Sequence, residues 1–232
     1  MLEIETLEEK RLIKVLVMFT VAIILLNIIN RLLGESSWQI SRLIRVGMES
    51  NLPTWFSSMM LAMAAFFAYR CSLVMTKKEG GRRMFQLLTL GLLGMSCDEV
   101  SQIHENLGKT INKYYFHLKN INSSWVILLG PFVLIFLIIF SLKIRKHLAG
   151  SVKAVKFLTL GFFIYITGAF LLEATSNFLN HLSLEWLWQI ETLLEESFEM
   201  IGIILIIKGL QEHYMFLVLG AQGPPIKNKF LN

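Results

Sequence analysis

Long apolar stretches separated by short polar loops fill most of this 232-residue chain. A helix that crosses a bilayer needs roughly 20 predominantly apolar residues, and six segments reach about that length. They cover residues 12–33, 54–76, 84–105, 122–145, 155–176 and 186–209. The pattern therefore predicts an all-α, polytopic membrane helical bundle with six transmembrane helices, forming a single integral membrane domain over residues 1–232. The first segment has an acidic flank and no small-residue cleavage site, so we expect it to be a retained helix.

The composition supports a membrane protein, and the positions of the cations predict its orientation. Hydrophobic residues make up 54% of the chain and charged residues 17%, whereas soluble domains are about a quarter charged. Sixteen of the 22 Lys and Arg fall in the N-terminal arm, the second and fourth loops and the C-terminal segment. Cytoplasmic loops carry the excess of Lys and Arg, so both termini are expected in the cytoplasm. The net charge of +5 is then explained by the cytoplasmic loops of a membrane protein, so no nucleic-acid partner is expected.

The segment between the first two predicted helices has two interpretations. Residues 36–49 interleave apolar side chains with Arg42 and Arg45, which is typical of an amphipathic helix on the outer membrane surface. A simple polar loop fits equally well. Asn51, Pro53 and Trp55 follow and are expected to begin the second helix, because Pro is tolerated in a first turn and Trp suits the headgroup level.

Ionisable residues interrupt three predicted helices where a lipid-facing helix is apolar. They are Asp98, Glu99, Ser101, Gln102, His104 and Glu105 in the third helix, Glu173, Asn177, Asn180 and His181 in and after the fifth, and Glu191, Glu195, Glu196 and Glu199 in the sixth. At 100° per residue, one face of the third helix carries Asp98, Ser101, Gln102 and Glu105, and His104 points away from Asp98. Gly202 follows the acids of the sixth helix and is expected to let another helix approach closely.

These acids are expected at similar depths. With a cytoplasmic N-terminus, Asp98 and Glu195 lie roughly 10 to 14 Å below the outer ends of their helices. Eight of the 17 acids fall in this outer half, and His104 is the one potential cation beside them. A charge at mid-membrane costs about 3 kcal/mol, and a Glu kept protonated at pH 7 costs about 4 kcal/mol. Metal cations, bound protons, a water-filled cavity or the folding of Arg31, Arg42 and Arg45 over the site are four ways to relieve the repulsion.

Structural roles are reasonable for some of these residues taken singly. Glu191 lies in the first turns of its helix, where the helix dipole favours an anion, and Glu105 and Glu173 lie near outer water. Acids deep in a membrane are rare and by default indicate function. The sequence therefore predicts a site that binds a metal or protons, formed by Asp98, Glu99, His104, Glu105, Glu173, Glu195, Glu196 and Glu199. Ser101, Gln102, Asn177 and Glu191 are expected to support it.

Four stretches of the chain carry a family resemblance. They are NLPTW (51–55), CDEVSQIHE (97–105), FLLEA (170–174) and EESFEMIG (195–202). Together they resemble a family of multi-pass bacterial membrane proteins, most of which are named only as hypothetical. The resemblance implies a location in the bacterial inner membrane and singles out the same eight site residues, but it brings no established activity.

Better-understood site patterns are missing from the sequence. Di-iron bundles use Glu-x-x-His pairs on two helices, zincins place two His four residues apart, and nucleotide-binding enzymes use glycine-rich fingerprints; none of these patterns occurs here. The sequence therefore leaves the enzyme question open.

Three functions are compatible with the acidic site. The first is a binding or transport protein for a metal cation or protons, in which the six helices divide into two inverted halves. Oxygen ligands favour Ca²⁺, Mg²⁺ or Mn²⁺, and His104 would shift the preference toward Mn²⁺, Fe²⁺ or Zn²⁺. The second is an intramembrane metal-dependent hydrolase acting on a lipid or lipid-linked substrate, with Glu105 as general base. The third is a non-catalytic membrane subunit whose polar cluster fixes helix packing.

Overall fold

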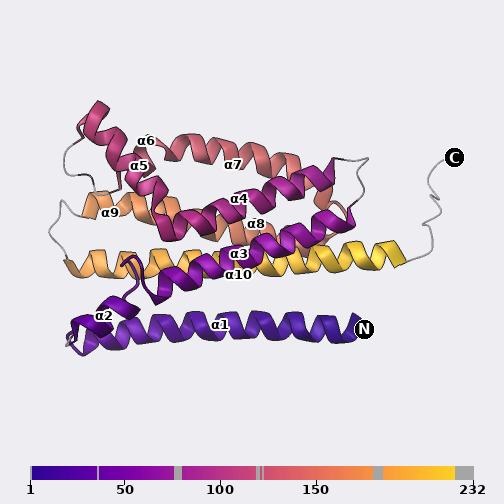
Figure 1. Cartoon of the computed structure of the whole chain (residues 1–232), viewed down its shortest axis with the longest axis horizontal. Coiled ribbons are helices and arrows are strands. Elements are labelled where there is room, and N and C mark those ends of the chain that lie inside the picture. Colours follow the sequence, from indigo (N-terminus) through magenta and orange to yellow (C-terminus); the bar gives the residue numbers. More distant parts are fainter. Residues whose placement is uncertain are drawn as a thin grey trace.

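The computed structural model describes residues 2–35, 37–75, 80–118, 121, 123–179 and 185–222, and all regular elements within these ranges are helical. The elements are α1 (Leu2–Leu32), α2 (Trp38–Ile44), α3 (Leu52–Val74), α4 (Gly81–Ser101), α5 (Ile103–Ile111), a π-helical turn (Asn112–Phe116), α6 (Ser124–Leu128), α7 (Gly130–Arg145), a 3-10 turn (Lys146–Leu148), α8 (Val152–Ile166), a second π-helical segment (Thr167–Leu172), α9 (Glu173–Leu179) and α10 (Glu185–Gln222). Figure 1 shows the long helices running along one common direction, with the start of α1 and the end of α10 at the same end of the bundle.

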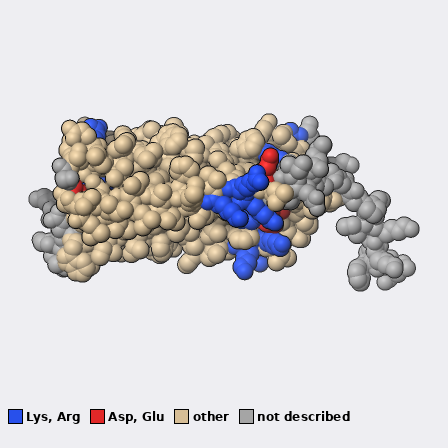
Figure 2. All heavy atoms as spheres, turned by 90° about the horizontal axis from the view of Figure 1, so that it is seen from below, with Lys and Arg blue, Asp and Glu red and all other residues tan. Residues whose placement is uncertain are grey.

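Three of the described helices are long and apolar enough to cross a membrane. They cover Lys10–Leu32, Leu52–Val74 and Val152–Asn177. On the face shown in Figure 2, most Lys and Arg lie in one cluster to the right of the middle, a few charged atoms lie at the left end, and the stretch between them carries neither cations nor acids. The chain thus has the helices of a membrane protein.

Three of the six predicted spans are helical but interrupted, which corrects their predicted continuity, whereas the span predicted over 186–209 lies within the continuous helix α10. The predicted helix over 84–105 breaks at Gln102, whose φ of 55° is left-handed and ends α4. The predicted helix over 122–145 divides at Leu129 into α6 and α7, and Pro131 lies in the first turn of α7, where its missing N–H costs nothing. The predicted helix over 155–176 changes to π-helical winding at Thr167–Leu172.

Of the two interpretations of the segment between α1 and α3, the helix is correct for residues 38–44, which form α2. Trp38 and Leu43 on α2 are exposed, and Val46 just after it is fully buried. As predicted, α3 begins at the Asn51 region, because the Asn51 side chain accepts a hydrogen bond from the Thr54 backbone N–H at 3.1 Å. This side-chain bond satisfies one of the free N–H groups in the first turn.

Helix α10 runs through the middle of the bundle and packs against α3 and α8. The prediction for Gly202 is confirmed, because a Cβ at this position would lie 2.7 Å from the backbone nitrogen of Tyr165 on α8. Gly161 on α8 allows the reciprocal approach, since its Cβ would lie 2.8 Å from the Ile206 nitrogen. The apolar core of α10 and its neighbours follows directly after the acidic turns and includes Met60, Leu61, Phe85, Leu92, Met200, Ile203, Ile206, Ile207 and Leu210.

Candidate functional site

The end of α4 brings Asp98 and His104 together. Because Gln102 turns the chain, the backbone N–H of His104 donates to Asp98 Oδ1 at 2.9 Å. The imidazole Nδ1 of His104 is also bonded to Asp98 Oδ2. The prediction that His104 points away from Asp98 is therefore wrong, because it assumed an unbroken helix to residue 105. About a third of each of these side chains is exposed, so the pair is open at one side (29% for Asp98 and 32% for His104).

The same break separates two other predicted residues from this pair. Glu105 lies on α5 and forms an ion pair with Lys109 at 2.5 Å, so it does not share a helix face with Asp98. Ser101 is exposed, and its hydroxyl donates to the Cys97 carbonyl on its own helix at 2.6 Å. Ser101 thus has a partner on its own helix, whereas Glu105 pairs with Lys109 and still lies within electrostatic range of His104 and Glu173.

The loop before α3 adds Glu49, an acid at the end of the segment for which the sequence left an amphipathic helix and a polar loop open. The Glu49 side chain interacts with Gln102, so the residue that breaks α4 also contacts this loop. Although Glu49 as a whole is exposed, partial burial of its carboxyl group, followed by the charge of Glu105, raises the pKa of Glu49. Hydrophobic periodicity gives no signal for the left-handed break at Gln102, and Glu49 was missed for that reason.

Glu191 and Glu195, one turn apart on α10, form a carboxyl pair. Their carboxyl groups interact with each other, and only 6% of Glu191 is exposed. Glu191 Oε1 is buried and receives no donor from the described part of the chain. An ionised carboxylate is only an acceptor, so two neighbouring carboxyl groups are joined by a hydrogen bond only when one of them carries a proton. The pair is therefore a candidate for sharing a proton.

Acids from α4 and α10 meet beside this pair. Glu99 on α4 interacts electrostatically with Glu196 of α10 and with Asp98. Glu199 interacts with Glu99, Glu195 and Glu196. Glu196 also accepts a hydrogen bond from the backbone N–H of Gly47 at 3.1 Å. The structure thus brings the acids of the third and sixth predicted helices into one half-buried cluster. The loop that contains Gly47 lies against this cluster.

Glu173 directly follows the π-helical segment and lies at the edge of this cluster. The indole N–H of Trp125 donates to Glu173 Oε1 at 2.7 Å, and the Trp125 ring lies edge-on to the His104 ring with centroids 4.5 Å apart. Asn177 fixes the neighbouring loop, because its Oδ1 accepts from the Ser123 N–H at 2.8 Å. Trp125 thus joins Glu173 to His104, while Asn177 has a structural role. Asn180 and His181 lie outside the described residues.

Tyr165 on α8 occupies the centre of the cluster and was not singled out from the sequence. It interacts electrostatically with Glu199, Glu99, Asp98 and Glu173, which come from three different helical segments. Gly202 lies against its backbone, so the close approach of α8 and α10 places the phenol among the acids. A tyrosine in the middle of an apolar span was the available signal.

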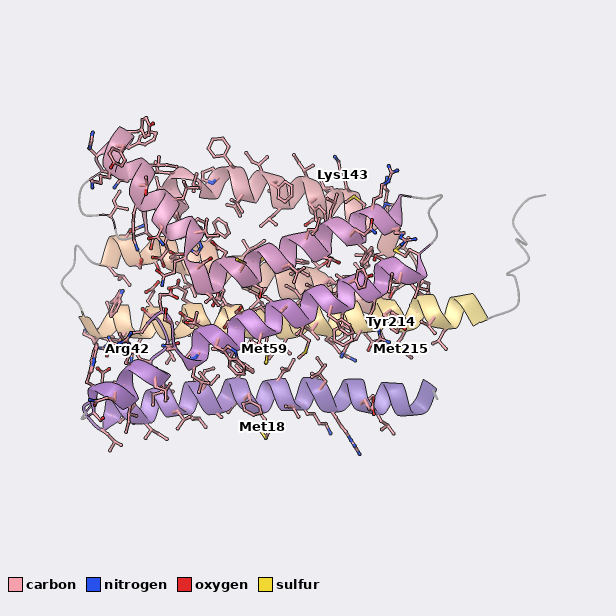
Figure 3. All side chains as sticks on the ribbon, viewed as in Figure 1. Met18, Arg42, Met59, Lys143, Tyr214 and Met215 are labelled. Atoms are coloured by element: carbon pink, nitrogen blue, oxygen red, sulfur yellow. The ribbon has the colours of Figure 1, made fainter. Side chains whose placement is uncertain are left out.

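The arginines of the first outer loop, which could relieve the repulsion by folding over the acids, have other partners in the structure. Arg45 forms an ion pair with Glu35 at 3.3 Å, and Arg31 Nη1 donates to the Gln189 carbonyl at 3.0 Å. Arg42 is exposed at the end of the bundle (Figure 3). Among the described residues, none of these three guanidinium groups forms an ion pair with an acid of the cluster, but Arg31 contacts α10 two residues before Glu191.

The metal hypothesis was tested against the arrangement of possible ligands. Among the residues with described side chains, no three His, Cys, Asp or Glu are placed so that they could hold one metal ion. The acids converge in pairs and at electrostatic range, and the backbone N–H of Gly47 and the indole N–H of Trp125 donate hydrogen bonds to Glu196 and Glu173.

A family match covers most of the chain. The family described as "Domain of unknown function (DUF8692)" matches residues 13–210, a range that contains the whole acidic cluster. No curated protein and no solved structure matches the chain. Because the matched range takes in both the bundle and the cluster, this chain belongs to the DUF8692 family.

Proposed function

We propose that this chain is a multi-pass protein of the bacterial inner membrane whose outer-half carboxylate–histidine site binds protons and exchanges them for a cation from the outer side. The observation that carries the proposal is the Glu191–Glu195 carboxyl pair. The two acids interact one turn apart on α10, and buried Glu191 Oε1 receives no donor from the described residues, so a shared proton would satisfy it. Further acids beside it provide sites to which that proton can move.

Two features support six spans with both termini in the cytoplasm. The start of α1 and the end of α10 lie at the same end of the bundle, as an even number of crossings requires. Figure 3 places Arg42 and Lys143 at opposite ends, which matches their assignment to an outer and a cytoplasmic loop. With this orientation the acidic cluster lies in the outer half, and the positive-inside rule is satisfied.

The exposure of Asp98 and His104 supports binding from outside. About a third of each side chain is exposed. Along α10 the acids are followed by fully buried apolar side chains, of which Met200 and Ile203 are the first. We therefore expect a charged ligand to enter beside Asp98 and His104, with the apolar core between the cluster and the other end of the bundle.

Proton release on cation addition tests the proposal. Protein in liposomes with a weakly buffered medium and a pH-sensitive dye is titrated with Mn²⁺ or Mg²⁺. We expect proton release from the wild type and a clear reduction in Glu195→Gln. Glu212→Gln is the matched control, because Glu212 lies on the same helix but pairs with Lys208 at 2.8 Å outside the cluster. Equal signals from all three proteins would contradict the proposal.

Metal analysis of the same samples separates protons from a resident metal. Stoichiometric metal in the wild type that disappears in Asp98→Asn and Glu195→Gln would show a metal site. Metal-free protein that still releases protons would support the proton form. Folded variants with neither property would leave the cluster with a packing role alone.

A hydrolase acting on a lipid or lipid-linked substrate is the second candidate, and the Asp98–His104 pair is the observation that favours it. A histidine oriented by a carboxylate is a common general-base arrangement, whereas Glu105 is paired with Lys109 and is a poorer base. Turnover of a bacterial lipid extract by the wild type, lost in His104→Gln, would establish catalysis. The same product yield with and without protein would exclude it for these lipids.

A further inference from the structure

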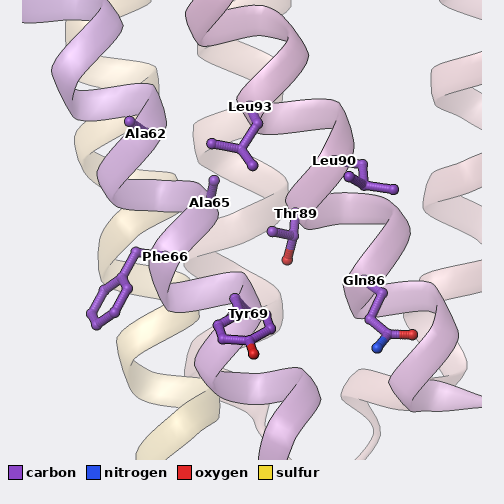
Figure 4. Close-up of a pocket in the computed structure, with 8 residues that line it drawn as sticks. All are labelled: Ala62, Ala65, Phe66, Tyr69, Gln86, Thr89, Leu90 and Leu93. Atoms are coloured by element: carbon purple, nitrogen blue, oxygen red, sulfur yellow. The ribbon is translucent and has the colours of Figure 1, made fainter.

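A lateral groove runs between α3 and α4 on the lipid-facing side of the bundle, away from the acids. Its volume is about 640 Å³, within the range of about 300–1,000 Å³ for small-molecule pockets. Apolar residues line most of it, among them Ala62, Ala65, Phe66, Leu90 and Leu93. Figure 4 shows these side chains on the two facing helices, with Ala62 and Leu93 toward one end and Tyr69 and Gln86 toward the other.

The end of the groove nearest the acids is closed. One turn beyond Ala62 and Leu93, the Ser58 hydroxyl donates to the Ser96 carbonyl at 2.7 Å, and the Ser96 hydroxyl donates to the Ser58 carbonyl at 2.8 Å. This reciprocal pair joins α3 to α4 directly. A ligand in the groove therefore enters from the other end, where α4 begins, and does not reach Asp98.

The open end of the groove is polar and then basic. Gln86 is exposed there, and Arg82 and Arg83 precede it by four and three residues, so both lie on the same side of α4 one turn nearer the membrane surface. The ion pairs that the described residues form involve other cations. Arg70, the neighbour of Tyr69, lies over the Tyr214 ring at 3.9 Å. Two arginines on α4 are thus placed to meet an anion at the groove's entrance.

We propose that this groove binds one acyl chain of an anionic phospholipid from the leaflet at which α4 begins, with the lipid phosphate held by Arg82 and Arg83. An apolar slot between membrane helices fits a hydrocarbon chain, and guanidinium groups prefer phosphate because of their planar donor fork. The serine pair sets the depth that the chain reaches. This binding site is independent of the acidic cluster and of any exchange reaction there.

Native mass spectrometry of the purified protein tests the proposal, with phosphatidylglycerol and phosphatidylcholine as the two probes. We expect one phosphatidylglycerol to be retained more strongly than phosphatidylcholine. The double variant Arg82→Gln/Arg83→Gln should lose this preference with a drop in affinity on the order of thirtyfold, since each of the two cations near a membrane surface contributes about fivefold. Lys10→Gln/Lys14→Gln on α1 removes the same charge elsewhere and should leave retention unchanged.

A filled groove provides the second test. Ala62→Phe should abolish retention of the single lipid, whereas Val133→Phe, which enlarges an exposed residue on α7, should not. Equal retention of the two lipids, or equal losses in the arginine and lysine variants, would overturn the proposal. A dimer of the wild type that Ala62→Phe dissociates would show that a second copy fills the groove, and would overturn it as well. The arginine variants decide the matter even where Ala62→Phe does not fold.

Discussion

Along α10, the turns from Glu191 to Glu199 and the turns from Met200 to Leu210 pass through one bundle but meet different partners. The first region faces the end of α4, the π-helical segment and the loop around Gly47, and its side chains are half-buried acids. The second faces the middle of α3, α4 and α8, and its inward side chains are fully buried and apolar. The same helix therefore carries an acidic, partly exposed region and an apolar, fully buried region.

The difference shows what each region requires of its neighbours. In the apolar region close packing suffices, because dispersion contacts need no particular partner. In the acidic region each carboxyl group needs a donor, a proton or water, since an unpaired buried charge costs several kcal/mol. The break at Gln102 supplies one such donor, because it turns the His104 backbone N–H toward Asp98, and the Trp125 indole on α6 supplies another to Glu173.

Moving an acid into the apolar region should have the largest effect. Ile207→Glu places a carboxyl group at a fully buried position, roughly 12 Å along α10 from Glu199. We expect a loss of about 3 kcal/mol or more of stability, or no folded protein. Thermal unfolding in detergent measures it, with Ile207→Leu as the control of similar volume. Wild-type stability in Ile207→Glu would contradict the distinction between the two regions.

Separating α8 from α10 at their boundary should have the next largest effect. Gly202→Leu forces a side chain into the backbone of Tyr165, and overpacking of this kind costs about 1–3 kcal/mol. Gly94→Leu is the control, because a Cβ at Gly94 meets nothing within 4 Å. We expect a lower unfolding temperature and weaker proton release in Gly202→Leu alone. Equal behaviour of the two variants would show that the close approach is dispensable.

A small pH effect is expected at the rim of the acidic region. The raised pKa of Glu49 means that the folded protein holds this proton more tightly than the unfolded chain does. Its contribution to stability is therefore full below the ordinary Glu pKa and is lost as the pH rises through the raised value. Unfolding temperatures of Glu49→Gln should fall less over this pH range than those of the wild type. Glu8→Gln, an exposed residue on α1, should follow the wild type.

Hydrophobic periodicity predicted the helical class, the region where α3 begins and the close approach at Gly202, because each depends on the local sequence. It did not predict the break at Gln102, since left-handed backbone at a residue other than glycine is set by tertiary contacts. That single turn decides that His104 joins Asp98 and that Glu105 does not. Tyr165 and Glu49 were missed for the same reason, because their neighbours come from distant segments.

The measurement that tests the central claim most directly is infrared difference spectroscopy of the protonated carboxyl groups. Spectra of the protein in liposomes are recorded at neutral pH and after a step to alkaline pH. A proton shared by Glu191 and Glu195 predicts a carbonyl band of a protonated carboxylic acid at neutral pH that is lost in Glu195→Gln and kept in Glu212→Gln. No such band in the wild type, or an unchanged band in Glu195→Gln, would contradict the account.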